Sequence, residues 1–142
     1  MLNRHVAIAC MILFIFIATT AHADSLAVVK TTRSGTSSVR VDGKRVWRAG
    51  GSGVKVVSSL VWSRRDDALA FATCNRLGRV ALIVVLIGGD THGHVMRWPI
   101  PAGALSCRGG ASIAWLGPRR VAVGPSLLVP SVVASWRVRA AR

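Results

Sequence analysis

Two histidines and an aspartate lie close together in one short polar segment, Asp90-Thr91-His92-Gly93-His94. Imidazole and carboxylate groups are common ligands of transition metals, and alternate histidines on a strand would point to the same face. The flanking glycines are more typical of a hairpin loop, in which polar residues need no functional reason. We therefore expect no metal, and Asp90, His92 and His94 are the candidate ligands if one binds.

Catalytic constellations are missing from the sequence. Serine nucleophiles often occupy a strained Gly-x-Ser-x-Gly turn, and the chain contains none. Asp66 and Asp67 are adjacent and follow Arg64 and Arg65, which indicates a solvated loop tip and not a pair of carboxylates in different environments. The sequence therefore predicts a protein that is not an enzyme and needs no cofactor.

The cysteines indicate a structural bridge. Cys10 lies in the N-terminal apolar segment, which leaves Cys74 and Cys107 as an even pair in the rest of the chain. Such a pair in an oxidising compartment is most simply a disulfide, whereas a thiolate zinc site needs four closely spaced ligands. The bridge would close a loop of about 34 residues and contribute roughly 3–4 kcal/mol in the chain-entropy model.

Residues 1–23 have the three parts of a secretory signal peptide. Arg4 gives a positive start, residues 6–18 form an apolar run, and Ala21 and Ala23 make the small-x-small pattern that precedes cleavage. The run is shorter than the roughly 20 residues that span a bilayer. We expect cleavage after Ala23, which leaves residues 24–142 as one periplasmic or secreted domain without a transmembrane span.

The chain is strongly basic. It has 16 arginines, three lysines, five aspartates and no glutamate, and the formal net charge is +14, or +13 for residues 24–142. A positive field attracts anions, but an arginine- and alanine-rich chain without tyrosine is also typical of a GC-biased genome.

Arginines next to tryptophans, as in Trp47-Arg48, Arg97-Trp98 and Trp136-Arg137, could form a nucleic-acid surface. Neighbouring residues on a strand face opposite sides, however, and an exported protein meets envelope polyanions more than nucleic acid. We expect an envelope protein or an acidic polymer as partner, and no nucleic acid.

The elements that would position these residues are β-strands. Short valine-rich runs alternate with turn residues, which is typical of an all-β fold. Asp42-Gly43 between two alternating runs predicts a hairpin over residues 38–47. The continuous apolar run 80–87 predicts a central strand buried on both faces. The other expected strands are residues 26–30, 54–62, 68–73, 95–100, 112–115, 120–123 and 132–138.

One segment of the chain is repeated. Residues 60–71 align with residues 113–123, with one residue fewer in the second turn, and the two tryptophans are 53 positions apart. Each copy reads as a strand that ends in tryptophan, a polar turn, and a second strand that begins aliphatic-alanine-aliphatic or aromatic. The expected core positions of the repeat are Trp62, Leu69, Phe71, Trp115, Val121 and Val123.

The first copy, with Trp62-Ser63 followed by Leu69-Ala70-Phe71, resembles the W-S-P-D-G-x-x-L-A-F motif of TolB-type, WD-like β-propeller repeats. The Pro-Asp-Gly turn of that motif is Arg64-Arg65-Asp66 here, and the second copy keeps only Trp115 and Val121-Ala122-Val123. The resemblance implies blade-like sheets near residues 54–101 and 111–139.

A closed propeller needs at least four blades, and residues 24–142 have room for about two and a half. Three alternatives follow: a relic of a larger propeller, a propeller completed by copies of the chain in a homo-oligomer, or a small open β-sandwich whose hairpins resemble blades. The expected function is an exported, non-enzymatic binding module of the cell envelope that contacts other proteins through its sheets. The alternative is a basic module that binds anionic envelope polymers or lipid head groups.

Overall fold

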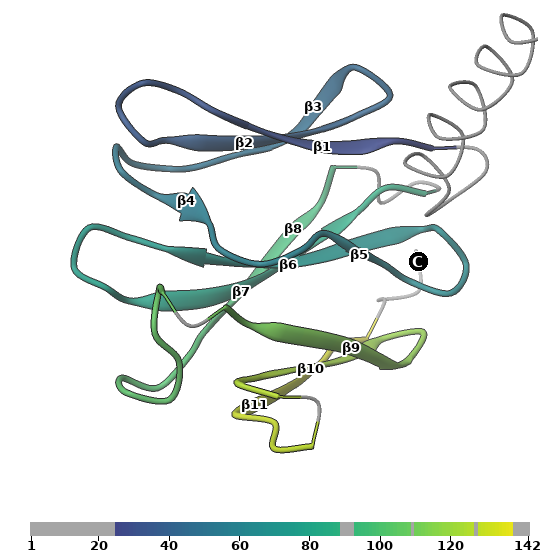
Figure 1. Cartoon of the computed structure of the whole chain (residues 1–142). Helices are drawn as coiled ribbons and strands as arrows, with labels where there is room; N and C mark the ends of the chain where they lie inside the picture. The colour runs from purple at the N-terminus through teal and green to yellow at the C-terminus, as the bar shows by residue number, and fades with distance from the viewer. Residues whose placement is uncertain (1–24, 89–92, 109, 127, 138–142) are drawn as a thin grey trace, which may run out of the picture.

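The computed structural model describes residues 25–88, 93–108, 110–126 and 128–137, and within these ranges the regular structure is entirely β-strand (Figure 1). In that part of the chain no helix has the length and apolar character to cross a membrane. The strands are β1 (Ala27–Thr31), β2 (Ser37–Val41), β3 (Lys44–Arg48), β4 (Lys55–Val56), β5 (Val61–Trp62), β6 (Ala68–Cys74), β7 (Val80–Leu86), β8 (Val95–Pro99), β9 (Ser112–Gly117), β10 (Arg120–Gly124) and β11 (Val132–Ser135).

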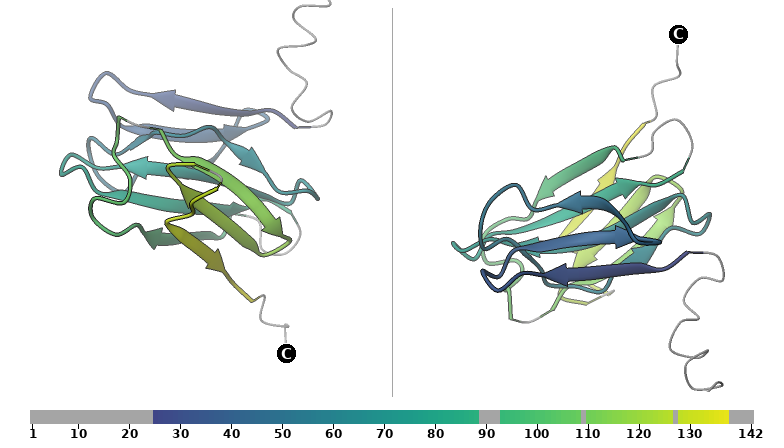
Figure 2. Two further views of the ribbon diagram at one scale, coloured as in Figure 1. Left: turned by 60° about the horizontal axis from the view of Figure 1, so that its bottom comes forward. Right: turned by 90° about the horizontal axis from the view of Figure 1, so that it is seen from above.

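The strands form three antiparallel sheets. The N-terminal sheet has the order β1-β2-β3, and the C-terminal sheet has the order β11-β10-β9. The central sheet has the order β4-β6-β7-β8, with β5 also paired to β6. Figure 1 shows the central sheet between the other two, and Figure 2 shows each outer sheet lying over one of its faces. The predicted all-β class is therefore confirmed as a small open stack of sheets.

The centre of the molecule is the pair β6 and β7. The two strands are paired along their whole length, from Ala68 opposite Leu86 to Cys74 opposite Val80, and nearly all of their residues are buried. A strand covered on both faces has no solvent-facing side, which explains why its sequence is apolar without alternation. The prediction of a central strand in this run is confirmed.

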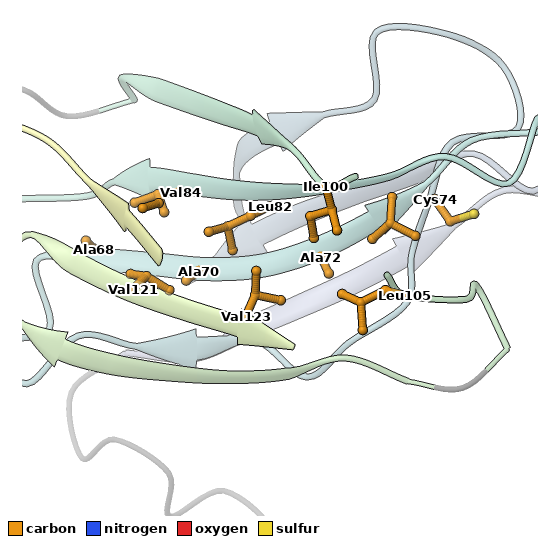
Figure 3. Packing of buried hydrophobic residues seen from close by; sticks show 12 residues of the cluster. Ala68, Ala70, Ala72, Cys74, Leu82, Val84, Ile100, Leu105, Val121 and Val123 are labelled. Atoms are coloured by element: carbon orange, nitrogen blue, oxygen red, sulfur yellow. The ribbon is translucent and has the colours of Figure 1, made fainter. Parts of the chain in front are cut away.

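Two hydrophobic clusters lie on opposite faces of the central sheet. The cluster toward the C-terminal sheet contains Val121 and Val123 of β10, packed on alanines and valines of β6 and β7 (Figure 3). The cluster toward the N-terminal sheet contains Val39 and Trp47, and the Trp47 ring meets the edge of Phe71 at 5.1 Å between centroids. Each outer sheet is thus held by its own core.

The Asp42-Gly43 hairpin forms as predicted. Asp42 has φ 50° and Gly43 has φ 80°, and two positive φ angles are what a type I′ turn requires. The register shifts between Val39, which lies opposite Trp47, and Arg40, so that one extra residue of β3 forms a bulge. Without the bulge, Val46 would lie opposite Val39 and point into the core. The extra residue places Trp47 there instead.

The stretch 54–62, expected as one strand, is two short strands along the edge of β6. The interruption is at Ser58, whose Oγ accepts a hydrogen bond from the backbone N–H of Ala72 at 2.8 Å. A side-chain oxygen here replaces the backbone carbonyl that a regular ladder would supply. Ser58 also forms a β-bridge with Ala111, so this break contacts the start of the C-terminal sheet. The prediction of a single strand was wrong for this reason.

The two copies of the repeat have the same register. Trp62 lies opposite Leu69 in the central sheet, and Trp115 lies opposite Val121 in the C-terminal sheet. Trp62 and Leu69 belong to the cluster toward the N-terminal sheet, while Val121 and Trp115 belong to the cluster toward the C-terminal sheet and face the central sheet. In each copy the tryptophan therefore points toward the preceding sheet of the chain, as expected for two successive sheets of one stack.

Candidate binding surfaces

The disulfide fixes the connection between the central and C-terminal sheets. Cys74 at the end of β6 and Cys107 in the β8–β9 connection are bonded, with their Cα atoms 5.8 Å apart, a normal spacing for a disulfide. Ile100 and Leu105 of the same connection are buried in the adjoining cluster (Figure 3). The bridge predicted from the cysteine count is thus present, and it holds the connection whose side chains complete the core.

The histidine segment gives no metal centre within the described residues. Asp90 and His92 lie outside these residues, and the prediction that concerns them stays untested. His94 is exposed, and its backbone carbonyl accepts a hydrogen bond from the N–H of Leu86 at 2.9 Å. Among the described residues, no three histidine, cysteine, aspartate or glutamate side chains gather as metal ligands would.

The turn after the first repeat tryptophan is organised by a buried serine. The Oγ of Ser63 donates to Asp67 Oδ1 at 2.7 Å and accepts from the backbone N–H groups of Asp67 and Ala68 at 3.2 and 3.1 Å. Asp66 has φ 56°, a left-handed conformation that aspartate tolerates in turns. Residues 64–67 are all exposed, so the predicted solvated tip is confirmed, and the Asp67 carboxylate also accepts a hydrogen bond within the turn. The sequence signal that could have identified Ser63 as the organiser of this turn is its position directly after the repeat tryptophan Trp62.

Three tryptophans of the cluster toward the C-terminal sheet contact one another. The ring of Trp136 lies 5.8 Å from those of Trp98 and Trp115, measured between centroids. Their arginine neighbours face outward, as Arg97 does beside half-buried Trp98. The rings therefore stabilise the interface between two sheets and are not arranged as a platform for bases.

A cleft of about 770 Å³ lies between the two turns of the repeat. Its lining includes the turn 63–67, the turn 116–118 and Trp115. Its charged residues are Arg64, Arg65, Asp66 and Asp67, so both signs are present in equal number. The charges of these four groups balance, and the hydroxyl of Ser63 and the carboxylate of Asp67, which also line the cleft, are bonded to each other within the turn.

A row of small apolar residues crosses the outward side of the C-terminal sheet. Ala114, Ala122 and Val133 lie opposite one another across β9, β10 and β11, and they point away from the core because their strand neighbours Val121 and Ala134 point into it. We call this row of three residues the open face. Val133 is 46% exposed there.

The open face corresponds, position by position, to a row that is covered in the central sheet. There Val61, Ala70 and Val84 lie opposite one another, and Ala70 and Val84 are completely buried under the C-terminal sheet. The repeat thus places the same kind of row in two successive sheets. In the described structure the row of the central sheet is covered by a neighbouring sheet, whereas in the C-terminal sheet Val133 is exposed, Ala114 is half-buried and Ala122 is buried among its strand neighbours without a further sheet over it.

The outward side of the N-terminal sheet has a different character. Val28 is 46% exposed and lies opposite Arg40, which in turn lies opposite Arg45. Ser38 lies opposite Arg48 on the same side. The two ends of the stack therefore present unlike surfaces, one with paired arginines and one with a row of small apolar residues.

Comparison of the chain with protein-family models, with curated proteins and with solved structures finds no match. The resemblance to TolB-type propeller repeats accordingly stays a prediction.

Proposed function

We propose that this protein is an exported, non-enzymatic binding module of the cell envelope that binds another protein through the open face of its C-terminal sheet. The observation that supports this is the correspondence between the open face and the covered row of the central sheet. An apolar row of Ala114, Ala122 and Val133 has the composition that, one sheet earlier, packs against a neighbouring sheet.

The shape and the surroundings of the open face favour a partner that offers a sheet of its own. Small side chains leave a flat surface, and stacked sheets approach to about 10 Å, which large protruding residues would prevent. Leu128 and Val129 of the β10–β11 connection are 92% and 63% exposed and extend the apolar area beside Gly124. Arg119 and Arg120 are exposed at the start of β10 and suit an acidic rim on the partner.

A matched pair of variants tests the proposal. Val133→Lys places a charge in the open face, and Val28→Lys places the same charge on the outward side of the N-terminal sheet, at a valine that is also 46% exposed. In cross-linking with envelope extracts, we expect the partner band of the unaltered protein to be lost in Val133→Lys and kept in Val28→Lys. Equal capture by both variants, with both shown to be folded by thermal unfolding, would exclude the open face.

The export part of the proposal rests on residues 1–23, which lie outside the described residues. Sequencing of the N-terminus of the protein recovered from the cell envelope or the medium should give Asp24 as the first residue. Recovery of the intact chain from Met1 would contradict cleavage after Ala23.

A further inference from the structure

A basic band runs around the free edge of β3, away from the open face. Its first part is a hollow of about 520 Å³ on the outward side of the N-terminal sheet. Arg45 and Arg48 are the charged residues that line it, and Gly50 and Gly51 form one border. The remaining polar lining includes the hydroxyl side chains of Thr32, Ser34, Thr36, Ser38 and Ser52.

The second part of the band is a hollow of about 300 Å³ between the N-terminal and central sheets. Arg79, immediately before β7, and Arg97 of β8 are its charged residues, and Asn75 adds a polar side chain. Gly50 and Gly51 line this hollow as well as the first. The two hollows therefore meet at these glycines, and one extended ligand could occupy both.

No described carboxylate lines either hollow. The described acids are Asp42, Asp66 and Asp67, and all three lie in turns at the other end of the sheets: Asp42 after β2, and the other two before β6. The four arginines of the band are exposed and face hollows that contain no acidic side chain among the described residues. Positive charge is thus concentrated here, whereas the cleft at the other end carries both signs.

We propose that this band binds a linear, phosphate-bearing polyanion. Guanidinium groups match phosphate oxygens with paired hydrogen bonds, and hydroxyl groups supply further donors of neutral charge. Glycine residues at the junction allow a ligand to approach the backbone closely, because no side chain stands there. A ligand with repeated phosphates can engage Arg45 and Arg48 on one side of the β3 edge and Arg79 and Arg97 on the other.

The shape of the band favours a flexible polymer over a lipid surface. The arginines line two recessed hollows on either side of a strand edge, and a planar membrane cannot enter both at once. A polymer chain can follow the turn at Gly50 and Gly51. This site is separate from the open face, so polyanion binding can be tested independently of the protein-binding proposal.

A substitution at the junction gives the sharpest test. A Cβ atom at Gly51 meets no other atom within 4 Å, and Gly51 is not among the glycines with positive φ, so Gly51→Glu and Gly51→Ala are both compatible with the fold. Fluorescence polarisation with labelled inorganic polyphosphate should show an affinity about tenfold lower for Gly51→Glu, because the carboxylate repels the ligand between both arginine pairs. Gly51→Ala should bind within about twofold of the unaltered protein.

Removal of the arginines separates a defined site from general attraction by net charge. Arg45→Ala with Arg48→Ala should weaken polyphosphate binding about tenfold or more and flatten its dependence on salt. Arg64→Ala with Arg65→Ala removes the same charge at the opposite end and should change the affinity by less than about threefold. Equal losses in both double variants, or binding to anionic phospholipid vesicles without binding to polyphosphate, would overturn the proposal.

Discussion

The indole Nε1–H of Trp115 donates a hydrogen bond to the backbone carbonyl of Val61 at 3.0 Å, across 54 positions of sequence. Trp115 is the tryptophan of the second repeat copy, and Val61 immediately precedes the tryptophan of the first. The bond joins β9 to β5, so it connects the C-terminal sheet to the central sheet at the same turn end of both. The two copies are thus linked directly through the residue type that reveals the repeat.

Replacing Trp115 by phenylalanine should destabilise the protein more than the same change at Trp136. Both rings are half-buried in one aromatic cluster, but only the Trp115 indole has a hydrogen bond to a backbone carbonyl in the part of the chain that the structure describes. A net hydrogen bond contributes about 1 kcal/mol, and the carbonyl of Val61 would lose this donor. Chemical denaturation of both variants measures this difference, and equal losses would contradict the role of the bond.

Ser63→Ala should lower the free energy of unfolding by about 1–3 kcal/mol, because three hydrogen bonds of one buried hydroxyl are lost and two backbone N–H groups lose an acceptor. Ser135 of β11 is exposed and is a suitable control. Ser135→Ala should change the stability by less than about 0.5 kcal/mol. A Ser63→Ala variant as stable as this control would show that water replaces the hydroxyl in the turn.

The sequence predicted most of the strands because their signals are local. Asp42-Gly43 specifies its turn through backbone conformation, and the run 80–87 could only be a strand buried on both faces. The alignment of the two repeat copies also indicates their register. Although the second turn is one residue shorter, Trp115 lies opposite Val121 as Trp62 lies opposite Leu69.

The missed features depend on contacts between distant segments. Ser58 interrupts an edge strand by binding the N–H of Ala72, which no local pattern of residues 54–62 indicates. The basic band needs Arg48 and Arg97 on opposite sides of the β3 edge, a proximity that appears only when two sheets stack. The open face was likewise invisible, because alanine and valine on a strand look alike whether covered or not.

The disulfide should be quantitative in exported protein. Free-thiol titration of denatured, unreduced protein should find no thiol if residues 1–23 have been removed, and one thiol, that of Cys10, if they remain. Replacing Cys74 and Cys107 by alanine should lower the stability by roughly 3–4 kcal/mol, because the loop of the unfolded chain is no longer closed. Two reactive thiols in the cleaved protein would contradict the bridge.

The mass in dilute solution should be that of a single chain and not that of a ring of copies. In a propeller completed by copies, the outward side of the N-terminal sheet of one copy would have to stack on the open face of the next. That contact would place Arg40 and Arg45 against Ala122 and Val133, and burial of unpaired guanidinium groups costs several kcal/mol each. The net charge of +13 on each chain after cleavage adds repulsion between copies. Light scattering coupled to size exclusion measures the mass; a stable assembly that Val28→Lys and Val133→Lys both dissolve would show that copies stack head to tail after all.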